Sequence, residues 1–116
     1  MSEKIFQDYY PDDIALCYGC GRHNEHGHHV RTYWNGQEGT ATFMPEAYHI
    51  GFPKVIYGGL LASLIDCHAM GVATAAACEK EGLDRAELPQ VMHVTANMNI
   101  NYLRGVRYSC KNPFNT

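Results

Sequence analysis

The sequence predicts one α+β domain in which an antiparallel sheet surrounds a single central helix. Three observations predict it: two short strand-like segments joined by Asn35-Gly36, one long apolar helical segment, and a longer alternating segment after it. The 116 residues have room for one compact domain, and 46% hydrophobic against 18% charged residues are enough to form a core. We therefore expect residues 1–116 to form one domain, with residues 1–27 as its lead-in.

The first two strands are expected at residues 28–34 and 39–44. Val30, Thr32 and Trp34 alternate along the first of them, and the Asn35-Gly36 that follows is typical of a hairpin turn. The second strand should run antiparallel to the first until Pro45 ends it.

A helix is predicted from Gly58, where the sequence becomes rich in Ala and Leu and free of Pro, to Gly82, which lies where a carboxyl-terminal cap is expected. The segment is apolar on nearly all sides, which is typical of a helix enclosed by other structure. The segment also contains Gly, Ser, Asp and His residues, which make it a poor match to a lipid-exposed span, so we expect no membrane partner.

Residues 91–103 alternate over their whole length and predict a long strand with one buried face. The apolar face is formed by Val94, Ala96, Met98, Ile100 and Tyr102. The polar face carries Thr95, Asn97, Asn99 and Asn101. Three strands leave an unpaired edge that proteins normally cover, so a further element or a partner should complete the sheet.

Charge and cysteine content narrow the function classes. The formal net charge is -3 and no basic run exceeds one residue, so nucleic acid is not an expected partner. The first residues lack both parts of a secretory signal, which indicates a cytoplasmic protein. The five cysteines are an odd number, and two of them lie inside the predicted helix, which favours reduced thiols over a disulfide framework.

Asp66 and the pair Gly58-Gly59 are the strongest candidates for catalytic residues. Asp66 is the only acidic residue between Glu46 and Glu79, inside an apolar helix, where a carboxylate is costly without partners. It suits a general base or nucleophile, and the alternative is a structural Asp bonded to a loop. The glycines lie at the helix amino terminus, whose free N–H groups favour developing negative charge. Together they suit acyl transfer to water.

The segment HIGFPKVIYGGLLASLIDCHAMGVA, residues 49–73, resembles the signature of hotdog-fold thioesterases of the phenylacetic-acid-degradation type. CYGCGRHNEHG resembles the opening of one branch of this family, and VTANMNINYLRG resembles its long strand. The resemblance covers roughly residues 16–106.

This resemblance implies a hotdog fold and an acyl-CoA thioesterase that acts on a small or medium acyl- or aryl-CoA without a cofactor of its own. Asp66 falls on the catalytic carboxylate of the family, and Gly58 and Gly59 fall on the pair whose amides hold the thioester carbonyl. Active sites of the family form between two subunits, so a homodimer or homotetramer is implied, with Asp66 of one subunit facing the glycines of the other.

The chain departs from the family pattern at three places. Tyr57 replaces the usual His before the glycine pair, and its hydroxyl can donate a hydrogen bond but cannot act as a base near neutral pH. Gly105 replaces the usual Pro. Family members continue with two further strands after the long one, so we expect a hotdog domain that lacks its C-terminal strands.

Four further residues are expected to contact substrate. His49 lies in the loop before the helix, and Tyr57 lies at its start. Asn97 and Asn99 share a strand face that would line a pantetheine channel. The alternative without a function is that His49 is a solvated loop residue and that the asparagines lie on the solvent-exposed face of the sheet. His68 should not pair with Asp66, because residues two apart on a helix do not face each other. Cys67 is not expected to be a nucleophile.

Two other functions stay open. A zinc-binding module is suggested by the C-x2-C pair Cys17 and Cys20, with histidines following closely at His23, His26, His28 and His29. No second ligand pair follows at zinc-finger spacing, so no metal is expected. The other is a hotdog protein that binds acyl-CoA without hydrolysing it, or an inactive shortened form.

Overall fold

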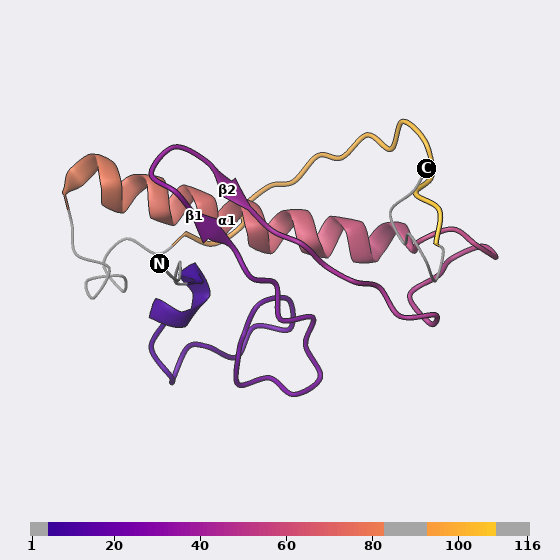
Figure 1. Ribbon diagram of the computed structural model, residues 1–116, viewed down its shortest axis with the longest axis horizontal. Helices are drawn as coiled ribbons and strands as arrows, with labels where there is room; N and C mark the ends of the chain where they lie inside the picture. Colours follow the sequence, from indigo (N-terminus) through magenta and orange to yellow (C-terminus); the bar gives the residue numbers. More distant parts are fainter. Residues whose placement is uncertain (1–4, 83–92, 109–116) are drawn as a thin grey trace.

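The computed structural model describes residues 5–82 and 93–108. In chain order, its elements are the 3-10 helix η1 (Phe6–Tyr9), the strands β1 (Tyr33–Trp34) and β2 (Gly39–Thr40), and the helix α1 (Gly58–Glu81). The long helix α1 forms the axis of the molecule, with the hairpin and η1 beside it and the segment 93–108 running along it (Figure 1). The expected α+β class is thus found, although the sheet is much smaller than predicted.

Helix α1 begins and ends where the sequence predicts. Its 24 residues give a length of about 36 Å. Gly82 follows it in the left-handed conformation, with φ 66° and ψ 24°, and its N–H points to the carbonyls of Cys78 and Glu79. Glycine adopts this conformation without a Cβ clash, which explains why the helix stops there.

The predicted hairpin is confirmed as an antiparallel pair. Tyr33 lies opposite Thr40, and Trp34 lies opposite Gly39. The turn is closed by the Asn35 side chain, whose Oδ1 accepts hydrogen bonds from two successive backbone N–H groups at 2.8 Å each. Asn35 therefore provides the local turn that its residue type favours.

Both hairpin strands are shorter than predicted, with two residues each instead of residues 28–34 and 39–44. The backbone of the first predicted strand bonds elsewhere, because the N–H of His28 donates to the Tyr18 carbonyl and that of Val30 donates to the Gly19 carbonyl, both at 2.9 Å. These bonds join the segment to the preceding loop, so its amino-terminal half does not enter a sheet.

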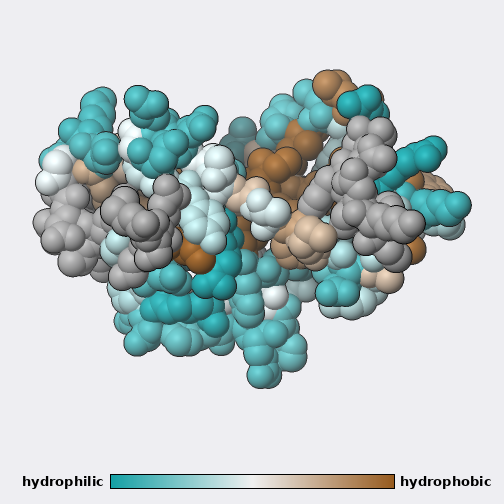
Figure 2. Space-filling view, in the orientation of Figure 1, coloured by the Kyte–Doolittle hydropathy of each residue, from teal (hydrophilic) through white to brown (hydrophobic). Residues whose placement is uncertain are grey.

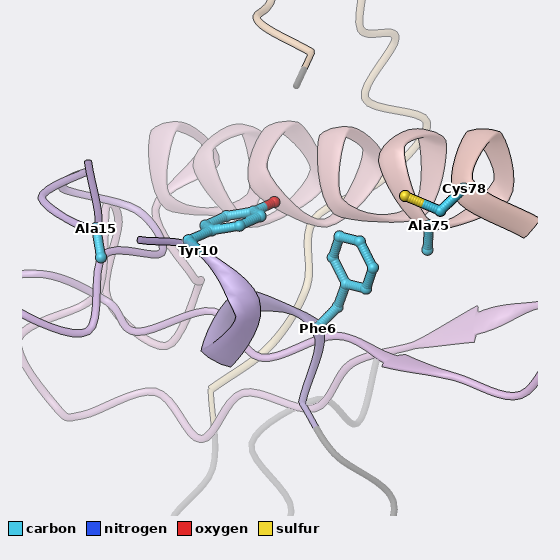
Figure 3. Close-up of a cluster of buried hydrophobic side chains, with 5 residues drawn as sticks. All are labelled: Phe6, Tyr10, Ala15, Ala75 and Cys78. Atoms are coloured by element: carbon cyan, nitrogen blue, oxygen red, sulfur yellow. The ribbon is translucent and has the colours of Figure 1, made fainter. Parts of the chain in front are cut away.

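The hydrophobic core lies between η1, the loop after it and the carboxyl-terminal half of α1. It consists of Phe6, Tyr10, Ala15, Ala75 and Cys78. Figure 3 shows the ring of Phe6 directed toward the part of α1 that carries Ala75 and Cys78. Phe6 is fully buried, so this contact anchors the amino-terminal segment to the helix.

A buried hydrogen-bond network lies beside this core. Thr32 Oγ1 accepts a hydrogen bond from Gln7 Nε2 at 3.0 Å and shares another with His68 Nδ1 at 3.0 Å. The backbone N–H of Thr32 donates to Gln7 Oε1 at 2.7 Å. Thr32 and Gln7 are both buried, so the network joins η1, the segment leading into β1, and α1.

The expectation that α1 is enclosed on all sides is wrong. Its buried residues are Leu60, Gly71, Thr74, Ala75 and Cys78, whereas Ile65 is 51% exposed. The radius of gyration is 15.1 Å, against about 13 Å for a compact domain of this length. Apolar residues gather around a hollow over the amino-terminal half of α1 (Figure 2). In the described part of the chain, the two-stranded sheet is too small to wrap a helix of this length.

The predicted long strand over residues 91–103 is also not found where the chain is described, from residue 93 onward. Residues 93–103 have no ladder partner there and instead follow α1 in the opposite direction (Figure 1). Three side-chain hydrogen bonds hold them to the helix: His93 to Thr74, Thr95 to Asp66, and Tyr102 to the Gly58 carbonyl.

Backbone pairing begins only after this segment. The N–H of Ile56 donates to the Val106 carbonyl, and the N–H of Tyr108 donates to the Lys54 carbonyl, both at 2.8 Å. These bonds attach the end of the described chain to the residues just before α1. The expected absence of two C-terminal strands falls on residues beyond Tyr108, which lie outside the described residues.

By length and composition, α1 is also the one helix in the described ranges that is able to cross a membrane. The core helix of a soluble protein passes the same test. The expected absence of a membrane partner therefore stays a prediction.

Candidate active site

Asp66 lies in the middle of α1 on the wall of a pocket of about 550 Å³. Its Oδ1 accepts a hydrogen bond from the Thr95 hydroxyl. Asp66 is partly buried, and residues from the loop 10–21 and the segment 93–95 line the same pocket. The pocket has the size of a small-molecule site. Asp66 therefore lines a cavity and has a hydrogen-bond partner, as expected for a carboxylate inside an apolar helix.

Gly58 and Gly59 form the first turn of α1, after the N-cap residue Tyr57. Within the described residues, neither glycine N–H has an acceptor, because the first bonds of the helix run from Leu60 and Leu61 to the Tyr57 carbonyl. Two N–H groups at the positive end of a helix dipole are suited to hold a carbonyl oxygen that becomes negative. The structure thus places both glycine N–H groups at the start of α1, and their role in holding an oxyanion stays a prediction.

The ring of Tyr57 lies against Gly59, where an added Cβ would come within 2.5 Å of the ring. The same side chain is 57% exposed, which is compatible with contact to a ligand that enters over the glycines. Its N–H donates to the His49 carbonyl at 3.0 Å. The predicted substrate contacts Tyr57 and His49 thus lie next to the helix start.

The His49 side chain packs in an aromatic group and does not line the Asp66 pocket. Its ring centroid is 5.9 Å from that of His28 and 5.5 Å from that of Phe43, and its Nδ1 accepts the Glu46 N–H. This group borders a separate pocket of about 270 Å³. Burial and the neighbouring His49 and His29 hold the pKa of His28 below its ordinary value.

Asn97 and Asn99 are exposed on the segment 93–103 and line neither pocket on α1. Within one chain they are not brought to Asp66. The residue of the same predicted face that does reach Asp66 is Thr95. Sequence reasoning placed Thr95 on the polar face with Asn97 and Asn99 but did not select it, although its position on that face was the available signal.

One chain does not bring Asp66 and the glycine pair onto the same reacting group. They are seven and eight residues apart on one straight helix, which separates them by about 10 to 12 Å along its axis. A single thioester carbonyl is too small to span that distance. The two halves of the predicted site act together only if a second copy supplies one of them.

A second pocket, of about 440 Å³, lies on another side of α1. Its lining is mostly apolar and includes Val30, Phe43, Leu61, Leu64, Ile65 and His68. His68 reaches Thr32 rather than Asp66, as expected for residues two apart on a helix. The described residues that line this pocket include no carboxylate, so the chemistry is not expected there.

The histidines after the C-x2-C pair do not join it. His23 bonds to Asp12 at 2.9 Å, His29 bonds to the Asn24 carbonyl at 2.6 Å, and His26 lies 3.4 Å from Glu25. In the described ranges, the residue that does approach both Cys17 and Cys20 is Cys67 of α1. The particular Cys/His zinc cluster considered from the sequence is therefore not formed.

Cys67 is partly buried beside Asp66. A hydrogen bond with Cys20, followed by burial, raises the pKa of the Cys67 thiol far above its ordinary value. Burial, and then the nearby Cys20, Cys67 and Cys17, likewise raise the pKa of the Tyr10 hydroxyl. A protonated thiol is a poor nucleophile, and the statement that Cys67 is not a nucleophile stays a prediction.

The chain matches the family model of the Thioesterase superfamily over residues 53–111. This range contains Asp66, the glycine pair and the whole of α1. No curated protein and no solved structure matches the chain. The matched range is half of the sequence and implies a hotdog fold. The chain therefore belongs to the thioesterase superfamily.

Proposed function

We propose that this protein hydrolyses the thioester of a small or medium acyl- or aryl-coenzyme A, as thioesterases of the phenylacetic-acid-degradation type do. The observation that carries the proposal is a thioesterase-family helix with one carboxylate, Asp66, on the wall of a pocket. Ile14, Ala15, Met70 and Val94 make part of that wall apolar, which suits an acyl or aryl group. No cofactor of its own is required.

In this proposal Asp66 activates a water molecule. Thr95 occupies Oδ1, so the other carboxylate oxygen accepts the proton of the water whose oxygen attacks the thioester carbon. The N–H groups of Gly58 and Gly59 stabilise the resulting oxyanion. The C–S bond then breaks, the carboxylic acid forms, and coenzyme A leaves with its sulfur protonated.

The separation along α1 leads us to propose a homodimer as the active unit, as is usual for symmetric oligomers. Asp66 of one copy would then act on a carbonyl held by the glycines of the other. The segment 93–103 supports this, since it is mostly exposed and has no strand partner in the described part of the chain, and a neighbouring copy is able to complete such an edge. A tetramer, and a cytoplasmic location, are further expectations of the same proposal.

The test is the loss of thioester absorbance for a panel of short-chain, medium-chain and aryl-CoA substrates. Asp66→Asn should lower kcat by about 100-fold to 10,000-fold with little change in KM. Glu81→Gln is the matched control, because Glu81 is exposed at the end of the same helix, and it should retain wild-type activity. Circular dichroism and sedimentation must show that all three proteins have the same fold and mass.

Two outcomes contradict the hydrolytic role. One is an Asp66→Asn variant with wild-type turnover. The other is a folded wild-type protein that hydrolyses no member of the panel; binding of acyl-CoA without turnover would then favour a non-hydrolytic acyl-CoA protein.

The dimeric site has its own test. Gly58→Pro removes the N–H group but keeps the helix, because the first helical position accepts Pro. Gly58→Ala keeps the N–H group, and its added Cβ would meet Tyr102 at an ordinary contact distance of 3.5 Å. Gly58→Pro should be impaired and Gly58→Ala should not. Mixing Asp66→Asn with Gly58→Pro should restore about a quarter of wild-type activity through one intact site per mixed dimer. No recovery after verified subunit exchange contradicts the shared site.

A further inference from the structure

Three thiols from two distant parts of the chain meet beside the Asp66 pocket. Cys17 and Cys20 come from the amino-terminal loop, and Cys67 comes from the middle of α1. Their sulfur atoms all lie within 4.8 Å of one another. Cys17 Sγ and Cys67 Sγ are 3.8 Å apart.

The loop is folded closely around Cys67. Gly19 leaves no space for a side chain, since an added Cβ would lie 2.2 Å from Cys67 Sγ. The turn is closed by a hydrogen bond of 2.7 Å from the Gly21 N–H to the Cys17 carbonyl, and the Gly19 N–H donates to Cys17 Sγ at 3.3 Å. Backbone N–H donation to a sulfur is a typical outer-shell contact of metal-binding thiolates.

The distance between the sulfurs of Cys17 and Cys67 agrees with a tetrahedral metal centre. With Zn–S bonds of about 2.3 Å, two ligands at a tetrahedral angle have sulfurs about 3.8 Å apart, and the Cys17–Cys67 distance has this value. A disulfide needs sulfurs at about 2.05 Å and would use only two of the three thiols. The geometry therefore suits a shared cation better than a bond between two sulfurs.

The electrostatics explain why a cation matters. Without one, three thiolates whose sulfur atoms lie within 4.8 Å of one another would repel each other. A bound divalent metal reverses this balance, because a coordinating thiol loses its proton. Soft thiolate ligands select zinc among the common divalent ions.

We propose that Cys17, Cys20 and Cys67 bind one zinc ion, with the fourth position open to the Asp66 pocket. Binding replaces three S–H bonds by three Zn–S bonds and releases three protons to solvent. Asp66 and His93 line the same pocket but lie outside the three-sulfur group, so a solvent molecule completes the tetrahedron. The ion connects the amino-terminal loop to α1 and holds one wall of the pocket in place.

The experiment measures zinc binding by reduced, tag-free protein from which metal has been removed with a chelator. The wild type should bind one zinc per chain, and cobalt in its place should give the intense sulfur-to-metal absorption of a thiolate site. Cys17 is exposed, so we expect the Cys17→Ser variant to fold. It should bind zinc about 100-fold more weakly or worse, since losing an outer-shell partner alone costs 10-fold to 100-fold. Cys78→Ala, which removes a thiol of the same helix outside the cluster, should bind like the wild type.

A second measurement needs no variant. Zinc should slow the alkylation of Cys17, Cys20 and Cys67 in the wild-type protein, as mapped by peptide mass spectrometry, and should leave the rate at Cys78 unchanged. The proposal is overturned if the reduced wild type binds zinc no better than Cys17→Ser, if protection does not map to these three residues, or if a Cys17–Cys67 disulfide persists under reducing conditions. None of these readouts depends on thioester turnover, so the zinc site and the proposed function fail or stand separately.

Discussion

Replacing Thr32 by Val tests the buried network that joins the amino-terminal segment to α1. Thr32 is fully buried, and Gln7 is 3% exposed. Val has nearly the same shape as Thr but no hydroxyl, so packing is kept while Gln7 Nε2 and His68 Nδ1 lose their partner at 3.0 Å.

The expected loss follows from the burial of each partner. A buried donor without an acceptor costs about 1 to 3 kcal/mol, and this applies to the Gln7 amide. His68 is only partly buried, so water can replace the hydroxyl there at little cost. The free energy of unfolding should therefore fall by about 1 to 3 kcal/mol, which lowers Tm by roughly 4 to 12 °C for a domain of this size.

Urea unfolding followed by circular dichroism measures the change. Thr32→Ser is the matched control: it keeps the hydroxyl and loses one methyl group, worth about 0.8 kcal/mol. Gln7→Leu together with Thr32→Val should destabilise less than the sum of the single changes, because the orphaned amide is then absent. The reasoning is refuted if Val destabilises no more than Ser, or if the two changes are additive.

Three further predictions concern the site and the helix end. Thr95→Val should lower kcat roughly 10-fold without changing KM, because Asp66 loses a hydrogen bond to its charge, and Thr95→Ser should restore the rate. Gly82→Ala should lower the free energy of unfolding by about 1 kcal/mol, measured by thermal melting, because φ is 66°, a conformation that L side chains rarely adopt. His28 should titrate by NMR below its ordinary pKa of 6.5. Its folded pKa is depressed, so the folded state resists protonation and stability should fall as pH drops through the unfolded pKa near 6.5; His49→Ala should move the His28 midpoint upward.

Each of these has a contradicting result. Equal loss of activity in Thr95→Val and Thr95→Ser would show that the hydroxyl is not what positions Asp66. Wild-type melting of Gly82→Ala would mean that the helix end relaxes without cost. A His28 midpoint above 6.5 would show that its burial is not maintained in solution.

The helix and the hairpin turn were predictable because their signals are local. Gly82 marks the end of α1 by its own backbone conformation, and Asn35 closes the turn with its own side chain. The predicted strand over residues 91–103 failed for the opposite reason. Alternation shows which side chains share a face, but a strand also needs a partner edge, and the described chain supplies none to residues 93–103.

The same distinction between local signals and tertiary contacts applies to the candidate site. The unusual carboxylate Asp66 and the glycines at the helix start were visible from composition and position alone. That Thr95 bonds to Asp66, that His49 turns into an aromatic group, and that Asn97 and Asn99 stay away from the pocket depend on how residues 93–108 and 41–57 return to α1.

By itself, the sequence determined the central helix, its two ends, the hairpin turn and the carboxylate on which the proposed chemistry depends, since each is encoded within a few neighbouring residues. Only the tertiary structure decided which distant groups meet. Cys67 joins Cys17 from 50 residues away, and Thr32 joins His68 from 36. Such contacts arise from the packing of the loop and η1 against α1, and no local periodicity in the chain specifies them.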